Sequence, residues 1–243
     1  MSSKIVSKLK HLKNNEFILY HHLGLGDSIV CNGMINYLSK EKGKKIHLPC
    51  STSTYSNLKF LYSKNKNVKV FEINSQIEIN DVIKYGDIEG LDILKVGFEN
   101  RTKGPFNKNF YKQIKIPYRF SFRYFYIPEI EKENLKELEL HLKKYYSVSL
   151  DYNLIHKESK EVDYTISIKN NYPSIYVEKD TDIFKNIFYY KNLIKNAREV
   201  HCVNSSFFHL VERVDTDAKL YFHNNRGGEL HFTKKWKIIN YDN

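Results

Sequence analysis

The fold class follows from residues 17–27, which read Phe17-Ile18-Leu19-Tyr20-His21-His22-Leu23-Gly24-Leu25-Gly26-Asp27. The apolar run at its start predicts a buried strand and the glycines predict a tight turn, after which apolar residues recur at helical spacing as far as Leu38. Two further strands are predicted at 45–48 and 68–73, with a helix at 55–62 between them. Strands that alternate with helices in this way predict a parallel sheet covered by helices, which is an α/β fold.

The second half of the chain repeats this architecture without repeating the sequence. A helix is expected at 129–145, and a later unit joins a strand at 199–203, the turn Asn204-Ser205-Ser206 and a helix at 207–214. The other expected elements are strands at 152–156, 164–168, 174–177 and 219–223 and a helix at 187–196. We therefore predict two Rossmann-like domains facing a cleft, at residues 1–118 and 119–243, with the aromatic and basic stretch 100–128 as their connection.

The charge of the chain indicates the kind of ligand it binds. The sequence has 243 residues and a formal net charge of +11. Clustered Lys and Arg would indicate nucleic-acid binding, but the lysines are scattered through almost every segment, so nucleic acid is not the expected partner. A basic surface still favours anionic ligands such as nucleotide diphosphates or acidic glycans.

Cysteine spacing and hydropathy indicate the compartment. Cys31, Cys50 and Cys202 are far apart and lack the spacing of a disulfide framework or a zinc site, which favours a reducing environment. No apolar stretch approaches the roughly 20 residues that cross a bilayer, and residues 1–13 form a basic amphipathic segment without a signal-peptide core. We expect a soluble, cytoplasmic protein; its oligomeric state is left open.

The turn after the first strand is the first candidate site. Gly24 and Gly26 let the backbone come close to a ligand, and the amides at the start of the following helix favour an anion or a hydroxyl. Asp27 fits a helix cap and a general base equally well. Because Ile29 replaces the third glycine of a dinucleotide fingerprint and no P-loop lysine follows, neither nucleotide motif fits. We expect His22 to line this site.

The second candidate site is the turn between the strand at 199–203 and its helix. Ser205 and Ser206 offer hydroxyl groups beside free helix amides, which suits a phosphate. His209 lies one turn into the helix and could add a donor to a diphosphate. His156 and Lys157, at the end of a predicted strand, and Arg226, in a glycine-rich turn, are further candidates for the same ligand.

Together the two sites resemble those of glycosyltransferases of the GT-B architecture, particularly the heptosyltransferase-like group that builds bacterial surface polysaccharides. Gly26 and Asp27 match the Gly-Asp turn of that family. The family's Asp-Ser/Thr-Gly-x-x-His segment is matched, with Asn for Asp and Ser for Gly, by Asn204, Ser205, Ser206 and His209.

The resemblance implies a role for each site. Asp27 would be the catalytic base, with His22, Gly24 and Gly26 in a loop on the acceptor side. Asn204, Ser205, Ser206 and His209 would hold the diphosphate of the donor. The implied activity is hexosyl or heptosyl transfer from a nucleotide-sugar to a glycan or other hydroxyl acceptor in polysaccharide biosynthesis, independent of metal and with inversion.

Two alternatives to this function stay open. The charge and the aromatic stretch 100–128 are compatible with a basic nucleic-acid-binding protein without catalysis. Asn204 and the short chain are compatible with a degenerate transferase fold kept as a binding module.

Two Asp-x-Asp triplets raise the question of a metal. Asp180-Thr181-Asp182 and Asp215-Thr216-Asp217 both match the motif that metal-dependent GT-A transferases use, but neither directly ends a predicted strand as that motif does. We therefore expect no metal role for Asp180 and Asp182, and no cofactor, since the nucleotide-sugar is a substrate.

Overall fold

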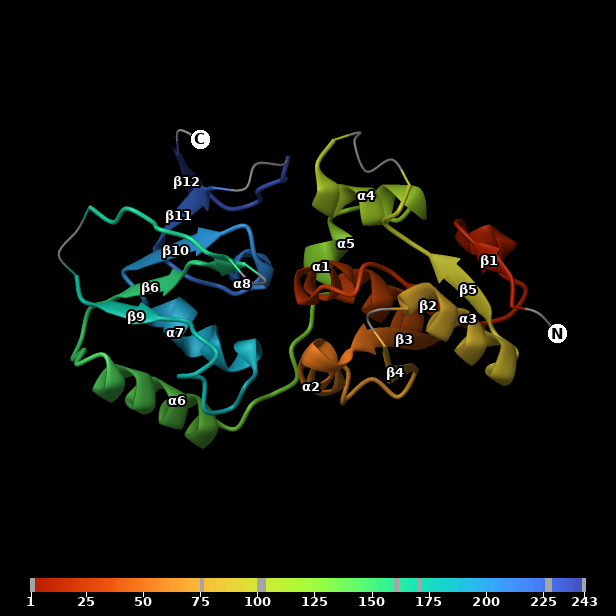
Figure 1. Cartoon of the computed structure of the whole chain (residues 1–243), viewed down its shortest axis with the longest axis horizontal. Coiled ribbons are helices and arrows are strands. Elements are labelled where there is room, and N and C mark those ends of the chain that lie inside the picture. The colour runs from red at the N-terminus through yellow and green to blue at the C-terminus, as the bar shows by residue number, and fades with distance from the viewer. Residues whose placement is uncertain are drawn as a thin grey trace. The chain divides into compact units, whose positions relative to one another are not determined.

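The computed structural model describes residues 3–74, 77–99, 104–159, 162–169, 172–225 and 229–241. The chain divides into two units (Figure 1). Unit 1 comprises Met1–Pro128 with Gly228–His231, and unit 2 comprises Glu129–Gly227 with Phe232–Asn243. Each has its own parallel sheet of five strands with helices, so the α/β class and the two Rossmann-like units predicted from the sequence are confirmed.

The sheet of unit 1 has the strand order β1-β5-β2-β3-β4, and all neighbours are parallel. Its strands are β1 (Ile5–Val6), β2 (Glu16–Tyr20), β3 (Lys45–Ser51), β4 (Val68–Ile73) and β5 (Asp92–Lys95). Its helices are α1 (Leu25–Asn36), α2 (Thr52–Leu61), α3 (Glu78–Glu89), α4 (Phe106–Gln113) and α5 (Phe120–Arg123). A short 3-10 turn at Leu9–His11 precedes β2, and a π-helical turn at Tyr37–Glu41 follows α1.

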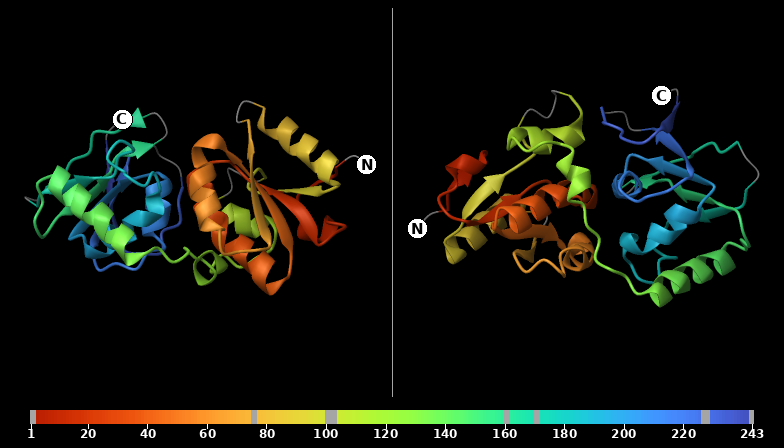
Figure 2. Two further views of the ribbon diagram at one scale, coloured as in Figure 1. Left: turned by 90° about the horizontal axis from the view of Figure 1, so that it is seen from below. Right: turned by 180° about the vertical axis from the view of Figure 1, so that it is seen from behind.

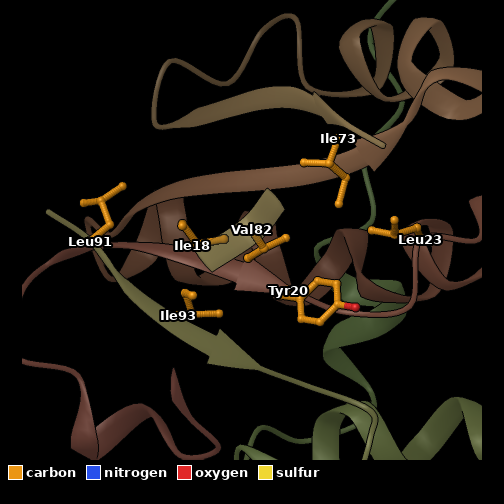
Figure 3. Close-up of a cluster of buried hydrophobic side chains, with 7 residues drawn as sticks. All are labelled: Ile18, Tyr20, Leu23, Ile73, Val82, Leu91 and Ile93. Atoms are coloured by element: carbon orange, nitrogen blue, oxygen red, sulfur yellow. The ribbon is translucent and has the colours of Figure 1, made fainter. Parts of the chain in front are cut away.

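Helix α3 covers one face of this sheet, and α1 and α2 cover the other (Figure 2). Because side chains alternate along a strand, Ile18 and Tyr20 of β2 both point to the α3 face. They pack with Ile93 of β5, Ile73 of β4 and Val82 of α3 in a buried apolar cluster that Leu23 and Leu91 complete (Figure 3). This cluster fastens α3 to the sheet.

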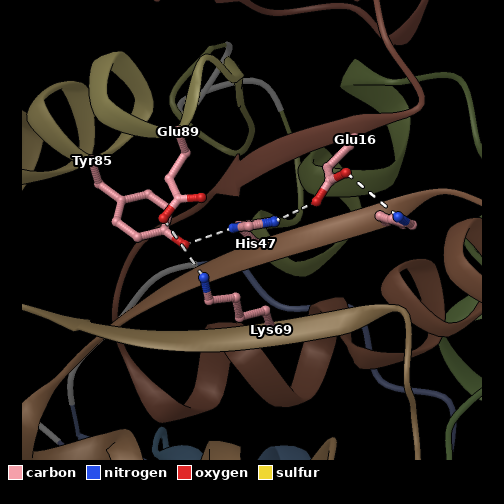
Figure 4. A network of polar contacts seen from close by, with 6 residues as sticks. Glu16, His47, Lys69, Tyr85 and Glu89 are labelled. Carbon is pink, nitrogen blue, oxygen red and sulfur yellow. Dashed lines mark hydrogen bonds and ion pairs between the residues drawn. The ribbon is translucent and has the colours of Figure 1, made fainter.

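A polar network lies beside that cluster, towards the amino-terminal ends of the strands (Figure 4). The buried His47 of β3 donates its Nε2–H to Glu16 (2.9 Å) and accepts at Nδ1 from the Tyr85 hydroxyl (2.7 Å). Tyr85 belongs to α3 and stacks on Phe71 of β4 with 3.8 Å between ring centroids. Both ring nitrogens of His47 therefore have partners, as a buried imidazole requires.

Residues 119–128, which the sequence assigned to the second domain, pack with unit 1 in the structure. The reason is the close contact of α5 with α1. Gly33 of α1 lies so near α5 that a Cβ there would come within 2.2 Å of the Phe120 carbonyl oxygen. Ser121 also donates to the carbonyl of Val30 (3.0 Å). The stretch read as a connection thus contains α4 and α5 and forms part of unit 1.

Unit 2 has the strand order β12-β11-β10-β6-β9, again all parallel. Its strands are β6 (Asn153–His156), β9 (Ser174–Tyr176), β10 (Glu199–Val203), β11 (Lys219–Asn224) and β12 (Trp236–Asn240). A small antiparallel pair, β7 (Glu158–Ser159) and β8 (Val162–Asp163), follows β6. Its helices are α6 (Lys132–Tyr145), the 3-10 turn η3 (Ile187–Tyr190), α7 (Lys191–Asn196) and α8 (Ser206–Val211).

The strand expected at 164–168 is wrong. Residues 164–169 are extended, and their exposure alternates as in a strand, but they join no sheet. The Ser167 amide donates to the Tyr241 hydroxyl (3.0 Å), and the Thr165 carbonyl accepts from the Asn225 side chain (3.4 Å). The side chains of Tyr241 and Asn225 therefore supply the hydrogen-bond partners that a neighbouring strand would have supplied.

Within the described residues, none of the helices combines the length and the apolar character that crossing a bilayer requires.

Candidate functional site

In unit 1 the predicted loop lies at the carboxyl end of β2, where α1 begins. Gly24 is the N-cap residue, and Asp27 is the third residue of the helix rather than its cap. Ser28 donates its amide and its hydroxyl to the Gly24 carbonyl (both 3.1 Å), which fixes the turn. A Cβ on Gly24 would lie 2.8 Å from Asp27 Oδ2, so the glycine makes room for the carboxylate. Asp27 and Gly26 are half-buried.

His22 lies in the same loop, among aromatic rings. Its Nε2–H donates to the Gly97 carbonyl (3.1 Å), and its ring is 4.2 Å from that of Phe98 and 5.7 Å from that of Phe106, centroid to centroid. Phe98, which follows β5, and Phe106, which begins α4, are both half-buried. The sequence did not single out these two rings, because neither β5 nor α4 was predicted.

His21, next to it, faces the interior. Its Nδ1 is hydrogen-bonded to the His22 carbonyl, and burial lowers its pKa to about 4. It is therefore neutral at neutral pH. This fits a packed residue of the loop better than a ligand-binding one.

In unit 2 the structure brings together two predicted residues at the carboxyl ends of neighbouring strands. His156 ends β6, and Ser205 follows β10, which pairs with β6. The Ser205 hydroxyl lies 3.2 Å from His156 Nδ1, and it accepts from the Phe208 amide (3.4 Å) as the N-cap of α8. The His156 ring stacks on Phe207, 5.3 Å away and 14° from parallel.

Burial sets the protonation of this pair. It lowers the pKa of His156 to about 4, so the imidazole is neutral at neutral pH. A neutral imidazole with one nitrogen turned to a hydroxyl keeps the other for a second hydrogen bond. Asn204 and Ser206, on either side of Ser205, are half-buried and lie in the same turn.

His209 is more deeply buried than Asn204, Ser205 and Ser206. It is only 6% exposed, and its Nδ1 has no hydrogen-bond partner among the described residues. Burial, with a contribution from the Arg213 charge, lowers its pKa to about 3. A role for His209 at the diphosphate therefore requires a neutral imidazole that reaches the ligand from a buried position.

Lys157 and Arg226 are the remaining residues that the sequence predicts for the donor site. The Lys157 ammonium lies over the ring of Tyr176 in β9, 5.7 Å from its centroid. Arg226 lies outside the described residues.

The first Asp-x-Asp triplet shapes a loop. Asp182 is buried, and its two oxygens accept from the amides of Phe184 (3.0 Å) and Asn186 (2.9 Å). Burial raises the pKa of Asp182 despite these bonds. Asp180 is exposed. Over the described residues, no group of three or more His, Cys, Asp or Glu side chains is arranged to hold a metal ion.

Comparisons with known proteins agree with this architecture. No family model and no curated protein matches the sequence. Among solved structures, a glycosyl transferase family 9 protein from Veillonella parvula is similar, with a TM-score of 0.57 and 9% sequence identity over 93% of this chain and 86% of that one. The fold resembles a glycosyltransferase fold. At this identity the likeness concerns the fold, and it spans nearly the whole chain.

Proposed function

We propose that this protein is a glycosyltransferase that moves a hexosyl or heptosyl group from a nucleotide-sugar to a hydroxyl acceptor such as a glycan. The observation that carries the proposal is the glycosyltransferase-like fold over 93% of the chain. The polar residues at the carboxyl ends of both sheets add to it, because ligands of open α/β sheets bind at those ends. The proposal assigns acceptor activation to unit 1 and donor binding to unit 2.

In unit 1, Asp27 is the proposed general base. Its carboxylate is half-buried in the first turn of α1, and Gly24 leaves space beside it. A carboxylate placed this way accepts the proton of the attacking hydroxyl as the new bond to the sugar forms. The rings of Phe98 and Phe106 beside His22 offer apolar surface on which a sugar can stack. Inversion follows if the hydroxyl attacks opposite the departing diphosphate.

In unit 2, the pair of His156 and Ser205 is the proposed contact for the diphosphate. The hydroxyl hydrogen of Ser205 can point at His156 Nδ1, which leaves the imidazole proton on Nε2. The Nε2–H group can then donate a hydrogen bond to a diphosphate oxygen while the histidine stays neutral. Asn204 and Ser206 supply further donors in the same turn. This division needs no metal ion.

The test separates base from binding. Asp27→Asn should lower kcat by ~10²–10⁴-fold while the Kd for the nucleotide-sugar stays within about twofold, because only proton transfer is lost. Asp180→Asn is the matched control, since it makes the same change at an exposed carboxylate, and it should keep full activity. Full turnover of a folded Asp27→Asn protein would remove the base assignment.

Donor binding is tested by a thermal-shift screen with UDP-, GDP-, ADP- and CMP-sugars, because a ligand that binds only the folded state raises Tm. One donor should raise Tm, and Ser205→Ala should reduce that shift. No shift with any donor would contradict the proposal. Binding without transfer would point to a binding module, and strongly salt-dependent binding of unrelated nucleic acid without donor binding would point to the nucleic-acid alternative.

A further inference from the structure

A pocket of unit 2 lies at the amino-terminal ends of its strands, away from His156 and Ser205. It measures about 560 Å³ and is bordered by the start of β11, by the residues before it and by the approach to β12. His156 and Ser205, in contrast, lie at the carboxyl ends of β6 and β10. The charged residues that line the pocket are Asp215, Asp217, Lys219, Lys234, Lys235 and Lys237.

One wall of the pocket is held in place by a buried carboxylate. Glu212 is 3% exposed and accepts four hydrogen bonds from the segment 233–236. Oε2 accepts from the amide (2.9 Å) and hydroxyl (2.6 Å) of Thr233, and Oε1 accepts from the Lys234 amide (3.3 Å) and the Trp236 indole. These bonds hold the backbone of the segment in place, and with it the points from which the lysine side chains extend.

The ammonium groups of the pocket are only partly compensated. Lys234 donates from Nζ to the Val214 carbonyl, and burial lowers its pKa. Lys237 lies over the Tyr221 ring, 5.7 Å from its centroid. Lys219 and Lys235 are exposed, and neither forms an ion pair with any residue that the structure describes. The pocket thus combines four lysines with two aspartates.

This charge balance decides what the second Asp-x-Asp triplet can do. A cation between Asp215 and Asp217 would face an excess of ammonium groups. An anion would be attracted by the same groups, and Asp215 and Asp217 would then keep the lysines apart and the pocket open. The three side-chain hydroxyls of the lining are already engaged, since those of Thr216, Thr233 and Tyr221 donate to Ile194, Glu212 and Glu199. Recognition would therefore be by charge.

We propose that this pocket binds a phosphate group, at a site separate from the proposed transfer reaction. A phosphate monoester carries close to two negative charges at neutral pH, which equals the excess of lysines over aspartates in the lining. Lys acts on phosphate as a point charge, so the geometry of the site need not be rigid. The phosphate is free in solution or part of a lipid headgroup, and the arms of the test distinguish the two.

Trp236 gives this pocket its own signal, because it is the only tryptophan of the chain and stands between Lys235 and Lys237. Its fluorescence is followed at low salt while inorganic phosphate, pyrophosphate, or vesicles that contain phosphatidic acid, whose headgroup is a phosphate monoester, are added, and calorimetry checks the binding. The variant Lys219→Ala/Lys235→Ala should bind about tenfold more weakly. The control Lys132→Ala/Lys136→Ala removes the same charge from the exposed face of α6 and should bind as the parent does.

Saturable binding of the soluble anions supports a small phosphate ligand, and binding of the vesicles alone supports a lipid headgroup. Equal affinity in the two double variants would overturn the proposal, as would no binding of any of the three probes. Polyglutamate that binds as tightly as pyrophosphate would overturn the assignment to phosphate. Mn²⁺ that quenches Trp236 in the parent but not in Asp215→Asn/Asp217→Asn would show a cation site instead. None of these outcomes depends on transferase activity.

Discussion

One face of the sheet lies opposite α1 and α2 in unit 1 and opposite α8 in unit 2, and the two units cover that face differently. In unit 1, α3 covers it with an apolar cluster of Ile18, Tyr20, Ile73, Val82 and Ile93, and a single histidine, His47, lies at its margin. In unit 2, the extended residues 164–169 approach this face, and its buried residues include Glu199, His201 and His223. A helix with an apolar stripe can seal a sheet by itself, whereas an extended segment leaves polar groups that must satisfy one another.

On this face of unit 2, the buried polar groups satisfy one another through one directed chain of hydrogen bonds. Tyr241 donates to His223 Nδ1 (2.6 Å), His223 Nε2 faces His201 Nδ1 (3.0 Å), and His201 Nε2–H donates to Glu199 (3.3 Å). Every donor meets an acceptor only while both imidazoles are neutral. The first face is thus held by burial of apolar area and the second by the protonation state of two histidines.

The largest effect is expected where the apolar face is broken. Val82→Asp places a carboxylate among aliphatic side chains without a partner, which should destabilise unit 1 by more than about 3 kcal/mol. Hydrogen exchange should show lost protection in β2, β4 and α3. Ile88→Asp, on the same helix but 74% exposed, is the control and should change stability by less than about 0.5 kcal/mol. Equal effects at the two positions would mean that α3 does not seal the sheet.

A smaller, pH-dependent effect is expected on the polar face. Burial and the neighbouring His201 lower the pKa of His223 to about 4, and burial also lowers that of His201. The unfolded chain therefore takes up protons first as the pH falls from about 6.5 to about 4, and stability decreases through that window. For His223 alone the loss between pH 7 and pH 5 is about 2 kcal/mol.

His223→Gln keeps hydrogen-bonding capacity but cannot titrate, so urea unfolding of unit 2 should depend less on pH between 7 and 5. His11→Gln, at an exposed histidine, should leave the pH dependence unchanged. If His223→Gln retained the full acid loss, the chain of histidines would not be its source.

The main architecture could be predicted from the sequence because the clearest apolar runs coincide with buried strands. The apolar run before Gly24 and the run before Asn204 became β2 and β10. The helix α3 escaped prediction because only Val82 and Gly86 are buried along it, and β5 because it has four residues. The wrong strand at 164–168 has the alternation of a strand, but alternation reports one covered face and says nothing about a ladder partner.

The residues of the candidate site could also be predicted only in part from the sequence. His156 and Ser205 could be named in advance, since parallel strands bring their carboxyl ends to one edge of the sheet. Phe98 and Phe106 could not, because their places beside His22 depend on β5 and α4. The burial of His209 was equally inaccessible, since helical spacing fixes a face but not what packs against it.

The smallest effect is expected at the link between the extended segment and the polar face. Tyr241 accepts from the Ser167 amide and donates to His223, so Tyr241→Phe leaves both without that partner. The loss should be about 1 kcal/mol, because the amide of this exposed segment can turn to water. Faster hydrogen exchange should be confined to residues 164–169 and to β11, while Tyr145→Phe, at a ring 63% exposed, should change neither. Unaltered protection of 164–169 in Tyr241→Phe would mean that this segment is held by the side chains of Tyr164, Ile166 and Ile168 instead, and the two faces would then differ less than the hydrogen bonds indicate.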